Sequence, residues 1–238
     1  SQAGEGFIKG TRVHTKEGLK PIEEIKVGDW VLSSPEDGSG SPEYKRVVTT
    51  FVHEDETIVD VHITLLDWSM SDPIYFAAAA ENHPFWVEGM GWTRADALKA
   101  GGVLRKSDGS LAKVFGLNRV YRTNREGVGW TFGGGDIKNR ALFWRQLGYD
   151  TYEEYFVAEV TGSLFDYANY TPINTEKPAH LAPEVIESAD PYLRVAVYNL
   201  DVEDFHTYYV GAKGFWVHSV NFQGGTLAKD IRNEAGAG

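Results

Sequence analysis

The sequence predicts an all-β fold of mostly antiparallel strands that carries a partly helical insertion. Short segments of alternating or β-branched apolar residues recur through the first half of the chain and again near its end. Turn signals rich in Gly, Asp and Ser separate these segments at close spacing, which is typical of an all-β domain. Residues 123–193 lose this pattern. We therefore expect one β-domain interrupted by an insertion.

The strand signals of the first half follow one another closely. The stretch "TRVHT" alternates, "GDWVLSS" follows a short turn, and "EDGSGSPEY" is a polar loop. The long stretch "YKRVVTTFVHEDETIVDVHITLL" predicts two β-branched strands on either side of a turn at Glu54–Glu56. Two further strands are expected in "PIYFAAAAENHPFWV", then a short helix in "GWTRADAL" and a hairpin whose turn is "SDGS".

The insertion shows helical spacing instead. Its beginning, "REGVGWTFGGGD", is Gly-rich and predicts a loop, and its end, "DYANYTPINTEKPAHLAPEV", is irregular and interrupted by prolines. Between them, apolar residues recur at a helical period, which predicts helical content. These positions are Leu142, Phe143, Leu147, Tyr155 and Phe156. Strand character returns at 194–219, and the polar stretch 220–238 predicts a flexible or partly helical tail.

Composition excludes several classes of function. The formal net charge of −11 argues against a broad nucleic-acid-binding surface. The chain contains no cysteine, which excludes disulfides, thiolate metal sites and a cysteine nucleophile. No apolar run approaches the roughly 20 residues of a membrane-spanning helix, and no His, Asp or Glu spacing resembles a metal site. We expect no cofactor, no metal, and no binding to nucleic acid or membrane.

Three stretches together suggest chemistry, although each by itself could be structural. They are "GFIKGTRVHTKEGLKPIEEIKVGDWVLS", "AENHPFWVEGMGWTRADAL" and "VYNLDVEDFHTYYVGAKGFWVHS". In this order they resemble the Hint superfamily, which includes inteins, bacterial intein-like domains, Hedgehog autoprocessing domains and the Hint modules of polymorphic toxins. The corresponding family patterns are C-F-x-x-G-T-x-V, T-x-x-H-P-F, V-Y-[DN]-L-x-V-E-x-x-H-x-[YF] and a terminal V-H-N. The third stretch is most similar to the bacterial intein-like and toxin-associated branch.

The resemblance implies a horseshoe-shaped β-fold and a set of site residues. The Hint parts would be 6–122 and 194–219, with 123–193 as the insertion and 1–5 and 220–238 as flanking segments. The two ends of the Hint part would share one site, with His83 near the 5–6 peptide and His206 near His218. The implied catalytic positions are Gly6 (nucleophile), Ala80, His83, Asn199, His206, His218 and Ser219 (terminal Asn).

The implied reaction is self-cleavage at two bonds, Glu5–Gly6 and Ser219–Val220. At the Glu5–Gly6 bond, the front end of the site, a thiol or hydroxyl at position 6 would attack the preceding carbonyl, and His83 would protonate the leaving amide or polarise the bond. At the Ser219–Val220 bond, the back end of the site, an Asn amide at position 219 would close a succinimide and release residue 220. His218 would then donate to the carbonyl oxygen, and His206 would shuttle the proton.

This sequence departs from the family at the reactive positions. Gly6 has no side chain, and a Ser219 hydroxyl attacking its own carbonyl would close a strained four-membered ring. The chain is thus either an engineered precursor, which we favour, or a degenerate homologue. The resemblance implies autocatalytic splicing or cleavage in cis, as a monomer, here in a disabled form. The alternative is a non-catalytic β-rich module of a larger secreted or toxin protein. The compartment follows from that choice: cytoplasmic for an intein, exported for a toxin.

The strand pattern also predicts the core. Buried positions are expected on the inner faces of the Hint strands, at Val13, Ile22, Ile25, Val31, Leu32, Val197, Leu200, Val210 and Val217.

Overall fold

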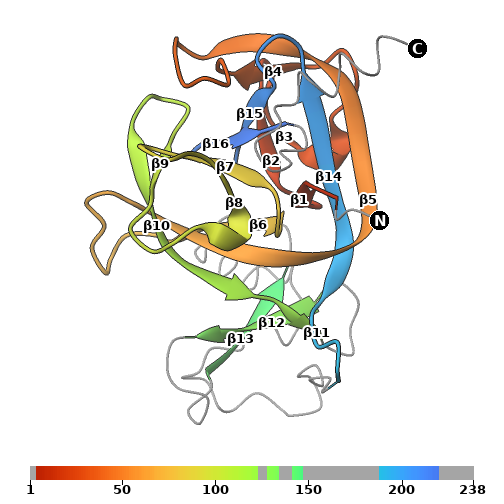
Figure 1. Cartoon of the computed structure of the whole chain (residues 1–238), viewed down its shortest axis with the longest axis vertical. Helices are drawn as coiled ribbons and strands as arrows, with labels where there is room; N and C mark the ends of the chain where they lie inside the picture. The colour runs from red at the N-terminus through yellow and green to blue at the C-terminus, as the bar shows by residue number, and fades with distance from the viewer. Residues whose placement is uncertain (1–3, 123–127, 134–140, 147–187, 220–238) are drawn as a thin grey trace.

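The computed structural model describes residues 4–122, 128–133, 141–146 and 188–219 of the chain (Figure 1). Within them, strands form a 13-stranded sheet and a three-stranded sheet, and every strand pairing is antiparallel. The first half contains β1 (Phe7–Ile8), β2 (Arg12–Thr15), β3 (Gly18–Pro21), β4 (Trp30–Ser33), β5 (Glu43–Leu65), β6 (Tyr75–Ala80), β7 (Pro84–Val87), β8 (Gly91–Arg94), β9 (Val103–Arg105) and β10 (Leu111–Arg119). The remaining strands are β11 (Tyr121–Arg122), β12 (Val128–Gly133), β13 (Ala141–Gln146), β14 (Arg194–Val202), β15 (Thr207–Val210) and β16 (Phe215–His218).

The large sheet closes on itself. Its path runs β10-β9-β7-β16-β15-β2-β4-β5-β14-β1-β6, and additional pairings join β10 to β5 and β5 to β6. These contacts create two closed circuits that share β5, and in Figure 1 that long strand wraps around the molecule. The expected horseshoe is thus closed by β10. The circuits bring strands from the two ends of the chain, β1 and β14, side by side.

The strand β5 corrects one expectation of the sequence analysis. A turn was predicted at Glu54–Glu56, but β5 runs without interruption through 23 residues. Its first part pairs with β4 and β14, and its second part pairs with β6 and β10. The register with β14 shifts between His53 and Glu56, so the strand accommodates these polar residues as an irregularity and continues where local composition favours a turn.

The insertion also differs from its prediction over the residues that the structure describes. The helix expected around Leu142 and Phe143 is wrong, since Ala141–Gln146 forms β13. It pairs with β12, within a stretch predicted to be a loop, and β12 pairs with β11. A six-residue apolar window fits either period, and cross-strand pairing decides between them. Leu147, Tyr155 and Phe156 lie outside the described residues, as does the predicted tail at 220–238. Elsewhere in the described residues, helical geometry is confined to two three-residue 3₁₀ turns, at Ile22–Glu24 and Ala95–Ala97. The short helix expected in "GWTRADAL" is therefore wrong, since this stretch forms strand β8 followed by the second of these turns.

The core agrees with the sequence prediction at all but one position. Leu32 is only partly buried. The other eight predicted residues are buried: Val13, Ile22, Ile25, Val31, Val197, Leu200, Val210 and Val217. A second, smaller apolar cluster around Ile58, Val120 and Val197 packs where the large sheet meets β11. The buried ends of β1 and β16 are therefore held between packed strands.

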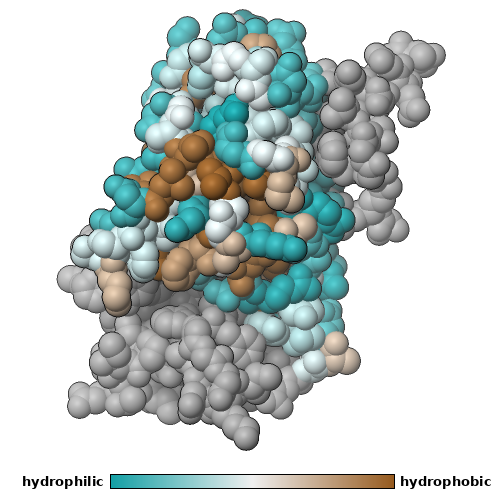
Figure 2. All heavy atoms as spheres, turned by 60° about the vertical axis from the view of Figure 1, so that its left-hand side comes forward, coloured by the Kyte–Doolittle hydropathy of each residue, from teal (hydrophilic) through white to brown (hydrophobic). Residues whose placement is uncertain are grey.

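Figure 2 shows apolar side chains gathered near the middle of one face and framed by polar residues. No helix in the described part of the chain is long and apolar enough to cross a membrane.

Replacing Phe85 by alanine should lower the free energy of unfolding by about 3–5 kcal/mol. Its fully buried ring packs against Phe7, at 5.8 Å between ring centroids, and truncation would leave a cavity there. Urea titration followed by tryptophan fluorescence measures the loss. Phe115, which is 47% exposed, is the matched control, and Phe115→Ala should change stability by less than about 1 kcal/mol. Similar losses in the two variants would contradict this packing.

Candidate functional site

The front of the site is built around Gly6. It lies buried just before β1, has φ of 148°, and its carbonyl accepts a hydrogen bond from the Ala80 N–H at 2.9 Å. A Cβ placed on Gly6 would lie 2.5 Å from the backbone oxygen of Tyr198 and 2.9 Å from its nitrogen. Backbone atoms inside a closed sheet cannot move aside as a flexible side chain can. The position that the resemblance assigns to a nucleophile is therefore packed for glycine.

The residues directly upstream are also embedded in the fold. Gly4 donates its N–H to the Glu56 carboxylate at 2.7 Å, and a Cβ on Gly4 would lie 2.0 Å from the His53 ring. Glu5 is buried between these two glycines. Residues 4–6 thus pass beneath β5 and β14 rather than extending from the surface.

The turn between β6 and β7 presents His83. Its N–H bonds the Ala80 carbonyl at 3.0 Å, and its own carbonyl accepts from Ala95 at 2.9 Å. The neighbouring Glu81 carboxylate accepts hydrogen bonds from the Thr57 hydroxyl and from Arg119, which fastens the turn to β5 and β10. The two sides of the turn are therefore fixed, and the imidazole cannot swing away from β1.

The His83 ring is enclosed and uncharged. Its centroid lies 4.4 Å from that of Phe7, the residue after Gly6, which places the histidine at the front of the site as predicted. Burial, the main cause, lowers the pKa of His83 to about 3, and the nearby positive charge of His218 acts in the same direction while the His218 backbone opposes it. Neither ring nitrogen has a hydrogen-bond partner of normal geometry within the described residues. At neutral pH the ring can act as a base or a neutral donor.

The turn between β14 and β15 presents His206. Asp204 and His206 both adopt left-handed backbone conformations, with φ of 62° and 56°. Such conformations cost about 1–2 kcal/mol in a residue with a side chain and are often found at functional sites. The imidazole Nδ1 lies 2.9 Å from the carboxylate of Asp201, and both side chains are buried. This contact favours a proton on Nδ1 and leaves Nε2 as the basic nitrogen.

Asp201 is buried although its neighbours suggest otherwise. The acidic residues Asp201, Glu203 and Asp204 follow one another closely, which is typical of a solvated turn, but the Asp201 side chain lies inside the fold. Its carboxylate also accepts a hydrogen bond from the Val202 N–H at 2.9 Å, so the group that contacts the histidine is itself fixed to the β14 backbone. The alternation of β14 directs position 201 inward, a feature that depends on the register and not on composition.

The back of the site is organised by Asn199. Its Nδ2 donates a hydrogen bond to the main-chain carbonyl of Ser219. Its Oδ1 accepts from the Tyr208 hydroxyl at 2.7 Å and from the Leu200 N–H at 2.9 Å. Since two donors occupy the oxygen, the amide has one orientation, with its N–H groups toward Ser219. Burial, followed by the negative charge of Glu5, raises the pKa of Tyr208 well above its usual range, so the hydroxyl remains a donor.

Ser219 itself is held by its backbone. Its N–H donates to the His206 carbonyl at 2.8 Å, which places the two predicted histidines, His206 and His218, next to each other. The Ser219 hydroxyl is buried and has no hydrogen-bond partner among the described residues. A buried unpaired hydroxyl is unfavourable by about 1–3 kcal/mol. Serine is therefore a poor match for this position.

His218 faces a loop that the sequence analysis did not connect with it. Its Nε2 lies 2.9 Å from the Glu36 carboxylate, and its ring packs on Trp92 with centroids 4.8 Å apart. The side chain is completely buried. Neither Glu36 nor Trp92 stood out as a candidate, because each lies in a different part of the sequence and only the closed sheet brings them together.

The structure therefore gathers the predicted positions around one dipeptide of β14. The Tyr198 backbone touches Gly6, and the Asn199 side chain binds the carbonyl of Ser219. Ala80 binds the Gly6 carbonyl through its backbone alone. Among the residues that the structure describes, no group of three or more His, Cys, Asp or Glu side chains is arranged to hold a metal ion.

Comparisons with known proteins agree with this architecture. The family described as "Pretoxin HINT domain" matches residues 12–120. The solution structure of a bacterial intein-like domain from Clostridium thermocellum is similar, with a TM-score of 0.53 and 22% identity, covering 92% of this chain and 100% of that one. In sequence, residues 12–120 are thus similar to a Hint domain, and the described fold is similar to that of a bacterial intein-like domain.

A second solved structure also matches this chain. The crystal structure of the gp41-1 intein has a TM-score of 0.46 and 16% identity over 91% of this chain and 100% of that one, and we draw nothing from it. No curated protein matches the sequence. The family match over residues 12–120 agrees with the predicted superfamily, and the structure confirms the predicted all-β fold.

Replacing Gly6 by alanine should destabilise the Hint domain by about 1–3 kcal/mol more than replacing Gly18 by alanine. Both glycines have a positive φ, but a Cβ on Gly18 would meet nothing within 4 Å. The difference in unfolding free energy between the two variants therefore isolates the overlap with Tyr198. Equal effects would show that position 6 has room for a side chain.

The buried neutral His83 should make the domain less stable in mild acid. In the unfolded chain this histidine binds a proton near pH 6.5, but in the folded domain only near pH 3. The contribution of neutral His83 to the free energy of unfolding is present above pH 6.5. It is lost as the pH falls from there toward 3, by at most about 1.4 kcal/mol per pH unit. Urea unfolding at pH 7 and pH 5 measures this slope. The slope should shrink in His83→Asn, and an unchanged slope would contradict a neutral His83.

Proposed function

We propose that this chain is the uncleaved precursor form of a self-processing Hint domain, with its back-end site arranged for cleavage of the 219–220 bond. The Hint family supports self-processing in general. The hydrogen bond from Asn199 Nδ2 to the Ser219 carbonyl oxygen is the observation that carries the proposal for this bond. A fixed donor at a buried carbonyl is what an oxyanion needs when that carbonyl is attacked.

The reaction requires asparagine at position 219. The side-chain nitrogen attacks the main-chain carbonyl carbon of the same residue, and a new C–N bond closes a five-membered succinimide. The bond from that carbon to the nitrogen of Val220 breaks. The proton lost by the attacking amide is balanced by the proton that the departing amine gains.

The surrounding side chains suit the steps of this reaction. His206, with Nδ1 held by Asp201, offers Nε2 as the base that moves the proton. Asn199 stabilises negative charge on the carbonyl oxygen, and Tyr208 keeps Asn199 turned toward it. His218 is the third catalytic residue that we propose, acting beside residue 219.

Ser219 stops this reaction in the present chain. Its hydroxyl would have to close a four-membered ring on its own carbonyl, so we propose that the 219–220 bond stays intact. The segments 1–5 and 220–238 then remain attached as the flanking parts of the precursor.

The front-end reaction is closed for two reasons. An acyl shift at the 5–6 bond needs a thiol or hydroxyl on residue 6, and Gly6 has neither. The contact of Gly6 with the Tyr198 backbone leaves no space for one in this arrangement. Val220 offers no nucleophile for ligation either. We therefore propose back-end cleavage, not splicing, as the activity that substitution at position 219 can restore.

The same packing at Gly6 favours a second candidate function. A Hint domain that has lost its chemistry could serve as a β-rich linker or interaction module in a larger secreted or toxin protein. A front end that has closed around glycine fits long-standing loss of the reaction better than a single trapping substitution at this position.

Replacing Ser219 by asparagine should release the segment 220–238 over time, in a reaction that needs no added thiol. Mass spectrometry of a purified chain with a tag on each end detects the two fragments. The fragment that ends at residue 219 should carry a succinimide and therefore be lighter, by one water, than the same fragment ending in a carboxylic acid. The unmodified chain and Ser219→Ala are the controls and should stay intact. An intact, folded Ser219→Asn chain across pH 5–9 would contradict the proposed function and support the non-catalytic module.

Asn199 supplies the internal test of this prediction. Adding Asn199→Ala to the Ser219→Asn chain should slow release by about 100-fold, the usual effect of removing an oxyanion donor. Asn118→Ala is the matched control, since that partly exposed amide lies on β10 and contacts His62 at 3.4 Å. Equal slowing by both substitutions would remove Asn199 from the mechanism. Changing Gly6 to cysteine should leave the 5–6 bond uncut.

A further inference from the structure

The loop between β4 and β5 is anchored at its start to the strand that follows His206. The Ser33 hydroxyl donates to the Thr207 carbonyl at 2.7 Å, and the Ser34 N–H donates to the Thr207 hydroxyl at 3.0 Å. The Thr207 hydroxyl in turn donates to the Ser34 carbonyl at 2.6 Å, and the Ser34 hydroxyl lies 2.7 Å from that of Tyr209. The loop therefore leaves β4 in a direction fixed by β15.

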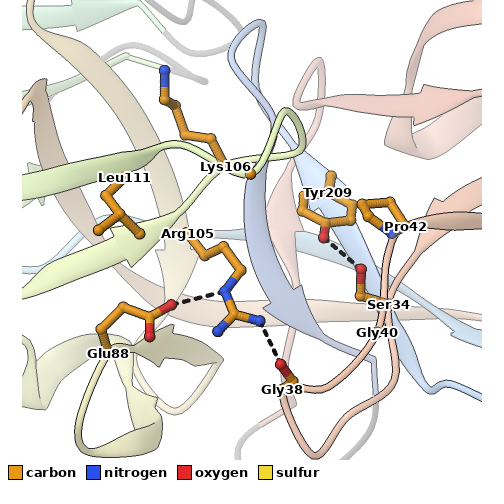
Figure 3. A pocket seen from close by; sticks show the side chains of 10 residues that line it. Ser34, Gly38, Gly40, Pro42, Glu88, Arg105, Lys106, Leu111 and Tyr209 are labelled. Atoms are coloured by element: carbon orange, nitrogen blue, oxygen red, sulfur yellow. Dashed lines mark hydrogen bonds and ion pairs between the residues drawn. The ribbon is translucent and has the colours of Figure 1, made fainter.

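The middle of the loop is anchored on the opposite side. The Trp92 indole N–H donates to the Glu36 carbonyl at 2.9 Å. Arg105 donates to the Gly38 carbonyl at 2.9 Å, and its Nε is held by the Glu88 carboxylate at 2.7 Å. Figure 3 shows Arg105 reaching from β9 to Gly38, across a pocket of about 420 Å³ whose opposite side carries the Ser34–Tyr209 pair. Contacts on both sides thus hold the loop in one position.

Glycine at position 38 allows this close approach. Its φ is 85°, and a Cβ there would lie 2.8 Å from the Trp86 ring. Trp86 in turn packs on Trp216, with ring centroids 5.0 Å apart. A loop that looks like a flexible polar connection in the sequence is therefore seated on an aromatic surface, directly beside the end of β16.

The anchored loop delivers one carboxylate to the end of β16. The Glu36 Oε2 atom lies 2.9 Å from His218 Nε2, and the Trp92 ring packs against the His218 ring. Two titratable side chains that face His218 are Glu36, from this loop, and His83, from the β6–β7 turn. A carboxylate beside a buried imidazole attracts its protonated form, and the uncharged His83 does not compete.

We propose that Glu36 is a positioning residue for the back-end reaction, holding the Nε2 proton of His218 and fixing the orientation of that ring beside residue 219. The inference rests on the proposed cleavage at 219–220. Glu36 touches no reacting atom and acts through His218. The loop contacts through Ser34, Trp92 and Arg105 are what keep the carboxylate in place.

Release of 220–238 from the Ser219→Asn chain provides the first test. Adding E36Q removes the negative charge and keeps the side-chain shape, so release should slow about tenfold above neutral pH. The pH dependence of the release rate should also change, because the His218 imidazole loses its carboxylate partner. A structural role of Glu36 alone would lower the rate without moving this profile.

Asp37→Asn is the matched control. Asp37 is the next residue of the same loop, and its carboxylate binds the exposed Ser39 and not His218. This variant should keep the rate and pH profile of the Ser219→Asn chain. Equal changes in E36Q and D37N would overturn the inference. If the Ser219→Asn chain itself releases nothing, the proposed function fails, and the second test below still decides the role of Glu36.

The second test uses the uncleaved chain with Ser219. Nitrogen-15 NMR of the histidine side chains reports which ring nitrogen carries a proton and at which pH the ring loses its charge. Between the unmodified chain and E36Q, the His218 signals should change while those of His206, which is paired with Asp201, should not. Unchanged His218 signals in a folded E36Q chain would overturn the inference.

Discussion

The site depends on a single constraint, the position of the dipeptide Tyr198–Asn199 in β14. The backbone of Tyr198 packs against Gly6, and the side chain of Asn199 donates a hydrogen bond to the carbonyl of Ser219. The strand is fixed by pairing with β5 on one edge and β1 on the other. A one-residue slip would turn Asn199 to the opposite face and separate the two ends. The register of β14 therefore links the two ends of the Hint part.

Around this strand, each of three polar side chains of the site is held by a separate partner. Asp201 holds His206, Tyr208 holds Asn199, and Glu36 holds His218. All three contacts are largely buried, so an unmatched partner would be unfavourable, and each geometry is narrowly defined. Such an arrangement is preorganised: little has to move before a reaction at residue 219. The Ser219 hydroxyl, which has no hydrogen-bond partner among the residues that the structure describes, is the group that does not fit it.

The two ends of the site nevertheless differ. At the back, the Asn199 amide donates a hydrogen bond to the Ser219 carbonyl. At the front, glycine at positions 4 and 6 allows the chain to pass where a side chain would overlap His53 or the Tyr198 backbone. One end of the site thus presents a fixed donor, while the other is packed around glycine.

Sequence alone determined the all-β class, eight of the nine core positions that were predicted, and the order of motifs that indicated the Hint superfamily, since each depends on local periodicity and residue identity. It failed at Glu54–Glu56 and at Leu142–Phe143, where pairing with distant strands overrode local signals. It also missed Asp201, Tyr208 and Glu36, which lie in unrelated parts of the chain or looked solvated. Tertiary structure alone decided that a polar loop brings its carboxylate to His218 and that position 6 has no room for a side chain. Both outcomes depend on which backbones the closed sheet places in contact, and no local pattern of residues encodes that.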